Sequence, residues 1–253
     1  MSRKLIATGA AALLVVGSLT AIALGRSNPP APAFAVSPVA IQTILRTLTG
    51  SYPPGKTSTG TGSPLADPTA AAAAGNAKVI FLSFDDGPEP TWTPEILKIL
   101  AKHGAKATFF ELGKMIWAHP GLRERVLAGG NTIGNHSISH PRLTKVSAAR
   151  RHHEIFDGPK SRCFRPPYGA SNSKVRADIK AAGMIQVLWD VDPRDWARPG
   201  TSAIAHRILY HAQRRKIVLM HDGGGNRSQT VAALDKMLPI LKAQGYSFPA
   251  MNC

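Results

Sequence analysis

The chain is poor in cysteine and in acidic residues. Of its 253 residues only two are cysteines, so at most one intrachain disulfide can form and no network of bridges can hold the fold together. Only 15 residues are Asp or Glu against 31 Lys or Arg, which excludes a charge-balanced chain and gives a net charge of +16. Residues 77–253 alone carry 26 basic and 14 acidic residues, so the excess is not confined to a tail. This imbalance predicts an anionic partner: a nucleic acid, a cell wall or a lipid surface.

The one long apolar run lies at the N-terminus. Residues 1–4 are basic, and residues 5–25 are 21 uncharged and almost wholly apolar positions. Such a run is long for a signal-peptide core and long enough to span a bilayer. Residues 1–25 are therefore expected to be a membrane anchor or a signal peptide, with Ala21-Ile22-Ala23 and Ala33-Phe34-Ala35 as candidate cleavage sites; a buried soluble helix is the third interpretation. Both leading interpretations export the rest of the chain, and this argues against a nucleic-acid partner.

Residues 26–77 have the composition of a low-complexity linker. Residues 51–74 are rich in Pro, Gly, Ser, Thr and Ala, which predicts a flexible stalk. Residues 50–57 match the phosphate-loop pattern G-x4-G-K-[ST]. That loop requires a preceding buried strand and a following helix, whereas this stretch contains Pro53-Pro54 and is followed by small polar residues. We expect no nucleotide to bind there.

From residue 78 the pattern becomes an alternation of apolar strands and helices. Strands are expected at residues 79–84, 107–110, 132–135, 163–165, 184–189 and 217–220, and helices at 94–104, 115–128, 146–155, 173–182, 201–211 and 229–243. This alternation predicts an α/β fold with a parallel sheet, either open or closed into a barrel. Ligands bind such folds at the carboxyl ends of the strands. Because Asp85, His136, Arg165, Asp192 and His221 fall at or just after expected strand ends, we expect them to share one site.

Five short polar motifs carry the candidate chemistry: residues 83–87 (SFDDG), 136–140 (HSISH), 165–168 (RPPY), 192–196 (DPRDW) and 219–222 (LMHD). In the first, Asp85 and Asp86 stand between an apolar strand and Gly87-Pro88. Adjacent carboxylates on a turn can point in different directions, so one can bind a cation while the other stays free as a base. Taken alone, the pair is equally compatible with a helix cap or an acidic turn.

The second motif predicts metal binding. His136 and His140 are four residues apart, so a helical or tightly turned backbone would direct both imidazoles to one side. Two imidazoles and one carboxylate form a common open zinc site. The alternative is a solvent-facing pair, which we expect for His152 and His153.

Together, in this order over residues 78–250, the motifs resemble those of the polysaccharide deacetylases, carbohydrate esterase family 4. The resemblance implies a distorted (β/α) barrel of about seven parallel strands. It implies that Asp86, His136 and His140 bind a divalent metal, zinc in most relatives and cobalt or another ion in some. In that family pattern Asp85 would be the general base, and Arg165 would orient it.

The same resemblance gives roles to the remaining motif residues. The backbone N–H of Tyr168 would stabilise the oxyanion. Asp195 would keep His221 protonated, and His221 would be the general acid that protonates the departing amine. Trp196 and Leu219 would line the pocket for the acetyl methyl group.

The resemblance leaves the substrate open. The leading expectation is an exported enzyme with residues 78–253 as the catalytic domain. It would remove N-acetyl groups from N-acetylglucosamine in a cell-wall glycan, with peptidoglycan as the first candidate. An O-deacetylase such as an acetylxylan esterase, or a chitin-oligosaccharide deacetylase, would use the same residues, and an inactive wall-binding module is the alternative from another class. The segment between His140 and Arg165 is short for the family, which bears on substrate preference. Cys163 and Cys253 are either a disulfide or two separate thiols.

Overall fold

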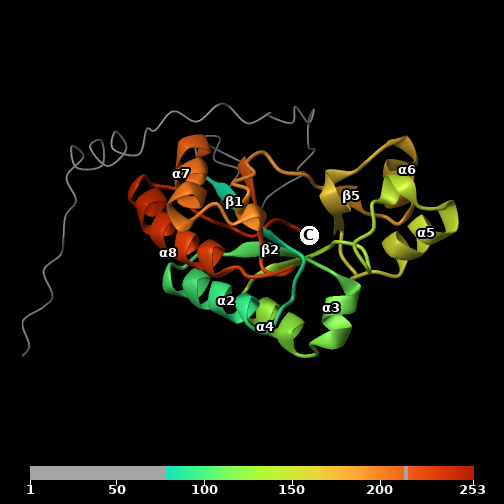
Figure 1. Ribbon diagram of the computed structural model, residues 1–253, viewed down its shortest axis with the longest axis horizontal. Coiled ribbons are helices and arrows are strands. Elements are labelled where there is room, and N and C mark those ends of the chain that lie inside the picture. The colour runs from blue at the N-terminus through green and yellow to red at the C-terminus, as the bar shows by residue number, and fades with distance from the viewer. Residues whose placement is uncertain (1–77, 214–215) are drawn as a thin grey trace, which may run out of the picture. The chain divides into compact units, whose positions relative to one another are not determined.

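A computed structural model describes residues 78–213 and 216–253 of the protein (Figure 1). The expected anchor or signal peptide (1–25), the linker (26–77) and the phosphate-loop match (50–57) lie outside the described residues. The described part contains one sheet of six parallel strands in the order β5-β4-β3-β2-β1-β6. The strands are β1 (Ile80–Asp85), β2 (Ala107–Glu111), β3 (Thr132–Asn135), β4 (Cys163–Phe164), β5 (Ile185–Gln186) and β6 (Lys216–His221).

Helices connect the strands, as parallel pairing requires. The α-helices are α2 (Trp92–Lys102), α3 (Gly113–Ala118), α4 (Leu122–Ala128), α5 (Ala148–Phe156), α6 (Ser173–Ala181), α7 (Thr201–His211) and α8 (Ser228–Ala243). Short 3₁₀ turns are η2 (Leu143–Lys145), η3 (Pro167–Gly169) and η4 (Asp195–Ala197). Helix α8 packs against α2 and α7 beside the central strands, whereas α5 and α6 pack together near β5 (Figure 1).

Side chains of β1 point alternately to the two faces of the sheet, of which one packs against helices and the other carries the candidate site. Ile80, Leu82 and Phe84 are buried in the main core with residues of α2, α7 and α8. Phe81 belongs to a second cluster on the other side of the sheet. Because successive side chains of a strand point to opposite faces, Ser83 and Asp85 share the side of Phe81. The first carboxylate of the first motif therefore enters the concave side of the sheet.

The sheet curls, and the segment that follows β5 links its two edges. The Val187 N–H donates to the Phe164 carbonyl of β4 over 2.9 Å. Four residues later, the Val191 carbonyl accepts a hydrogen bond from the Leu219 N–H of β6, also 2.9 Å long. A disulfide between Cys163 and Cys253 ties β4 to the C-terminal segment.

The expected α/β fold with a parallel sheet is confirmed, and the curled sheet is consistent with a distorted barrel. The described residues hold six strands rather than about seven. The single helix expected over residues 115–128 is wrong, since α3 ends before Pro120 and Gly121, at φ 89°, turns the chain into α4. The strand expected over 184–189 is shortened to β5, because the chain leaves β4 and crosses toward β6. Across residues 78–213 and 216–253, none of the helices combines the length and apolar character that a membrane crossing needs.

Candidate active site and metal centre

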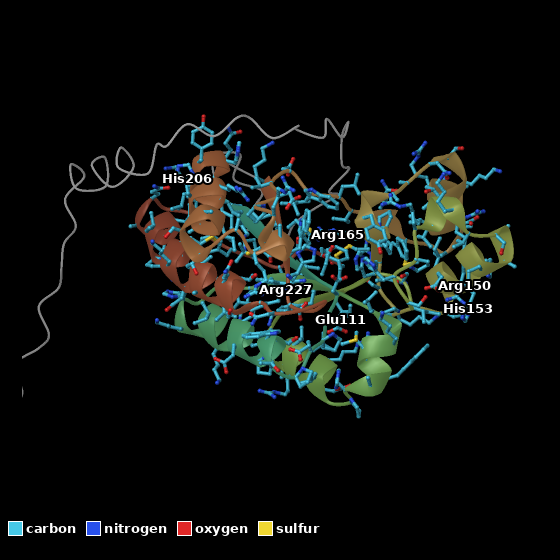
Figure 2. All side chains as sticks on the ribbon, viewed as in Figure 1. Glu111, Arg150, His153, Arg165, His206 and Arg227 are labelled. Carbon is cyan, nitrogen blue, oxygen red and sulfur yellow. A yellow bond between two sulfur atoms is a disulfide. The ribbon has the colours of Figure 1, made fainter. Side chains whose placement is uncertain are left out.

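The motif residues meet at the carboxyl ends of the strands. β1 and β6 are paired so that Asp85 stands beside His221. His136 directly follows Asn135, the last residue of β3, and Arg165 directly follows β4. In Figure 2 the labelled Arg165 lies near the middle of the described part. The sequence-based expectation that the motifs share one end of the sheet therefore agrees with the arrangement of the strands.

Asp86, His136 and His140 form a candidate metal centre. One ligand atom of each residue lies within 4.8 Å of the other two. Asp86 Oδ1 is 3.3 Å from His140 Nε2 and 3.6 Å from His136 Nε2, separations longer than strong hydrogen bonds. The same oxygen is buried and accepts no hydrogen bond from the described residues. A divalent cation between these atoms would satisfy all three, so the donor set fits the expected metal.

The backbone and a hydrogen bond aim these ligands. Asp86 (φ 77°) and His140 (φ 64°) both adopt the left-handed conformation that non-glycine residues rarely occupy. The Nδ1 atom of His136 donates to the Arg165 carbonyl over 2.7 Å, which leaves Nε2 as the free lone pair on the side of Asp86. Burial lowers the pKa of His136 to about 3, so the ring is neutral, as a metal ligand must be.

Arg165 is fully buried and holds Asp85. Its Nη1 donates to Asp85 Oδ1 over 2.6 Å and to Ser83 Oγ over 2.9 Å, and its other nitrogens donate to backbone carbonyls of the segment after β5. Burial raises the pKa of Asp85, and the adjacent Arg165 charge opposes that rise. Because Arg165 occupies Oδ1, Asp85 Oδ2, which lies 3.6 Å from His136 Nε2, is the oxygen that can accept a proton.

His221 and Asp195 form a second charge-paired couple on the other side of Asp85. His221 Nδ1 donates to Asp195 Oδ1 over 2.7 Å, and the His221 N–H donates to Oδ2 over 2.9 Å. Thr230 Oγ1 also donates to Oδ2, over 2.8 Å. Burial alone would lower the pKa of His221, but the hydrogen bond and charge of Asp195 outweigh it and raise the pKa to about 8. His221 is therefore protonated at neutral pH and can give up a proton from Nε2.

The three residues expected to contact substrate have different surroundings. Tyr168 has a φ of 60° and is 58% exposed, and no described residue accepts a hydrogen bond from its backbone N–H. Leu219 is buried in β6, two residues before His221, so both side chains face the same side of the strand. Trp196 is 48% exposed, and the Arg194 guanidinium lies 5.2 Å from its ring centroid. Their roles in binding stay predictions.

The loop after β6 supports Asp86, a role that the motifs did not indicate. A Cβ on Gly223 would lie 2.3 Å from the Asp86 carbonyl oxygen, and one on Gly224 would lie 2.8 Å from Asp86 Oδ2. Arg227 fixes this loop by donating to the carbonyls of Gly223 over 2.7 Å and Gly224 over 3.0 Å. The run of glycines in residues 223–225 was the signal for this close approach.

Two further buried carboxyl groups lie beside the site. Neither oxygen of Glu111, the last residue of β2, has a hydrogen-bond partner among the described residues, and Asp222 Oδ1 has none either. Asp222 Oδ2 accepts a hydrogen bond of 2.6 Å from Thr93 Oγ1. Burial and the nearby Asp222 carboxyl raise the pKa of Glu111 to about 8, and burial raises the pKa of Asp222 to about 7. Glu111, labelled in Figure 2, is therefore largely uncharged at neutral pH.

Comparison with known proteins agrees with the geometry. Residues 72–187 match the family model described as polysaccharide deacetylase. The sequence is 45% identical over 187 aligned positions to a peptidoglycan-N-acetylglucosamine deacetylase of Bacillus cereus, and the match covers 70% of this chain and 88% of the relative. It is 36% identical over 188 residues to a chitooligosaccharide deacetylase of Bradyrhizobium sp., covering 66% of this chain and 86% of that one.

The fold is also similar to that of solved structures. The structure of the peptidoglycan deacetylase PdaC from Bacillus subtilis superposes with a TM-score of 0.63 and 37% sequence identity. The similarity covers 69% of this chain and 88% of that chain.

Proposed function

Because the chain belongs to the polysaccharide deacetylase family, we propose that it is a metal-dependent hydrolase that removes N-acetyl groups from N-acetylglucosamine in peptidoglycan. One observation carries this proposal: two different proton-transfer groups flank the candidate metal centre. Asp85, held by Arg165, and His221, held by Asp195, stand opposite each other on paired strands. Hydrolysis of an amide requires a base for the attacking water and an acid for the departing amine, and this pair supplies both.

The residues then have the following roles. Asp85 Oδ2 takes a proton from the attacking water, while Arg165 keeps the other oxygen in place. The Tyr168 N–H donates to the oxyanion as it develops on the acetyl carbonyl. The Nε2 of His221 donates a proton to the departing amine, which is otherwise a poor leaving group. Leu219 and Trp196 contact the acetyl methyl group.

Asp86, His136 and His140 would hold the metal, and we propose zinc, with cobalt or another divalent ion as the alternative. When bound, the ion supplies Lewis acidity toward the water and the acetyl carbonyl. The support from this chain is the buried, unpaired Asp86 oxygen beside two neutral imidazoles.

A set of basic residues that form no ion pair with any described residue favours an anionic glycan over a neutral chitooligosaccharide as the substrate. The three acidic residues between positions 142 and 186 are each paired within that segment: Glu154 with Arg150, Asp157 with His153 and Asp178 with Arg151. Seven exposed cations of the same segment form no ion pair with any described residue, and we call them the basic lobe: Arg142, Lys145, Lys160, Arg162, Lys174, Arg176 and Lys180.

The basic lobe extends to the rim of the site. The Arg142 guanidinium lies 4.7 Å from the Tyr168 ring centroid, and that ring makes an edge contact with His140 at 4.5 Å. Peptide-substituted glycan strands carry carboxylates and chitooligosaccharides do not, so Coulomb attraction favours the former. The same charge would attract an anionic cell wall or membrane surface, and we propose neither nucleic acid nor nucleotide as a partner.

We propose that the protein is exported, either anchored at the cell surface by residues 1–25 or secreted after their cleavage. The Cys163–Cys253 disulfide supports this, because disulfides persist in oxidising compartments.

An O-deacetylase such as an acetylxylan esterase would use the same residues. An inactive wall-binding module is less favoured, since every expected proton-transfer and ligand residue is present.

The test is acetate release by the purified protein. Peptidoglycan, chitooligosaccharides and acetylxylan are supplied in parallel, before and after chelation and after readdition of zinc. We expect acetate from peptidoglycan, loss of at least 100-fold on chelation and recovery with zinc. Full activity of a verified metal-free sample would overturn the metal assignment, and release from acetylxylan alone would overturn the N-deacetylase assignment.

A further inference from the structure

A buried glutamate outside all five motifs is bonded to the loop between the two histidine ligands. Glu154 lies on α5 and is fully buried. Its Oε2 accepts hydrogen bonds from the N–H groups of Ile138 (2.9 Å) and Ser139 (2.8 Å). Its Oε1 accepts from Ser139 Oγ over 2.6 Å and pairs with Arg150 Nη2 over 2.6 Å. Arg150, labelled in Figure 2, also donates to Ser139 Oγ over 2.8 Å.

The loop that Glu154 holds has an unfavourable backbone conformation. Ser137 (φ 72°) and His140 (φ 64°) are both left-handed, a conformation that non-glycine residues rarely adopt and that persists only where surrounding contacts hold it. At the ends of this loop Ser137 N donates to Asn135 Oδ1 and His140 N donates to Ser137 Oγ. The carbonyls of Ser137 and Ile138 accept hydrogen bonds from N–H groups at the start of α3, over 3.0 and 3.1 Å. The N–H groups between those ends donate to one carboxylate from a different helix.

We propose that Glu154 is a positioning residue of the metal centre, which holds the 137–139 loop in the conformation that sets His140 opposite Asp86. The carboxylate is suited to this task because both of its oxygens are acceptors and every group facing them is a donor. Removing it leaves the buried N–H of Ile138 and the partly buried N–H of Ser139 without partners, which favours other loop conformations. His140 is affected more than His136, because His136 is fixed separately by the end of β3 and by the Arg165 carbonyl.

The inference rests on the proposed metal site and is tested by the zinc affinity of the full-length protein. Zinc dissociation constants are measured by chelator competition for the wild type and for Glu154→Ala, Glu154→Gln and Ser139→Ala. Loss of a residue that orients a ligand typically weakens metal affinity about 10–100-fold. We expect a weakening in that range for Glu154→Ala. We expect a smaller one for Glu154→Gln, whose amide oxygen can still accept from both N–H groups, and for Ser139→Ala, which keeps them.

The matched control is Asp157→Asn, directly after the end of α5, at an exposed residue whose ion-pair partner among the described residues is His153. It should leave the zinc affinity unchanged. A second readout is the visible absorption of the cobalt-loaded protein, which reports ligand geometry and should change in Glu154→Ala but not in Asp157→Asn. Raising the zinc concentration should restore most of kcat in Glu154→Ala, because the residue acts through metal binding.

Zinc affinities within twofold of wild type for Glu154→Gln and Ser139→Ala, or for a folded Glu154→Ala, would overturn the inference. A Glu154→Ala protein that melts lower in the metal-free state yet binds zinc normally would make Glu154 a fold residue and would equally overturn it. If Glu154→Ala does not fold, graded weakening in the two milder variants supports the inference. A wild type that binds no zinc would instead remove the proposed metal site itself.

Discussion

Replacing Asp195 by Asn tests the assignment of the general acid. The amide oxygen of Asn can still accept the hydrogen bond from His221 Nδ1, but the negative charge that favours the imidazolium is lost. The pKa of His221, about 8 in the wild type, should then fall to the ordinary value of about 6.5 or below, because burial also favours the neutral ring. A shift of 1.5 units corresponds to about 2 kcal/mol of lost stabilisation of the imidazolium.

The magnitude follows from the protonated fraction of His221. At pH 7.5 a group with a pKa near 8 is about 75% protonated, and one with a pKa near 6.5 is about 10% protonated, so kcat/KM should fall about eightfold from this cause alone. Since the protonated form is the active one, wild-type activity is lost as pH rises through about 8. In Asp195→Asn this basic limb should move below about pH 6.5.

The assay is the pH dependence of kcat/KM for acetate release, with the His221 titration followed by NMR in the same proteins. Thr230→Val is the matched control, because it removes one hydrogen bond to Asp195 Oδ2 but keeps the charge. Its basic limb should move much less. A basic limb that stays near pH 8 in Asp195→Asn, with the His221 resonance shifted as expected, would show that His221 is not the acid.

Other variants test separate parts of the account. Asp85→Asn should lower kcat by at least about 1,000-fold while zinc content, measured by elemental analysis, stays at the wild-type level; normal turnover would disprove the base assignment. Titration of Glu111 should lower the stability of the folded protein as pH rises from about 4.5 to about 8, by up to about 1.4 kcal/mol per pH unit. The reason is that the pKa of Glu111 is raised in the folded state, which keeps the proton over this range while the unfolded chain loses it. Glu111→Gln should therefore raise the melting temperature more at pH 8 than at pH 5, and parallel curves would contradict this. Neutralising Lys174, Arg176 and Lys180 with Gln should raise KM for peptidoglycan several-fold and weaken its salt dependence, with no change for chitotetraose; equal effects on both substrates would refute selection by charge.

The five motifs could be identified from the sequence because each is a pattern of neighbouring residues. The spacing of His136 and His140 and the position of Asp85 at the end of a fully buried strand are both local patterns, and the parallel sheet brings them to one end. Pro120 and Gly121 were also a local signal for the break between α3 and α4, which the apolar pattern of residues 115–128 obscured.

What could not be predicted depends on contacts between distant segments. No short-range pattern shows that Glu154, on a polar helix, accepts hydrogen bonds from a loop 15 residues earlier. The sequence pattern of residues 184–189 predicts one strand, yet the hydrogen-bond partner of the chain changes from β4 at Val187 to β6 at Val191, which depends on the curl of the sheet. Pairing of Cys163 with Cys253 joins residues 90 positions apart, and the sequence left it open against two free thiols.

The most direct test of the central claim is mass spectrometry of defined N-acetylated glycans after incubation with the zinc-loaded protein. Muropeptides from peptidoglycan should each lose one acetyl mass per N-acetylglucosamine, with the glycosidic bonds intact and free acetate in equal amount. Asp85→Asn with full zinc content should leave the same glycans unchanged. Unaltered masses with the wild-type protein, across both peptidoglycan and chitooligosaccharides, would contradict the proposed activity.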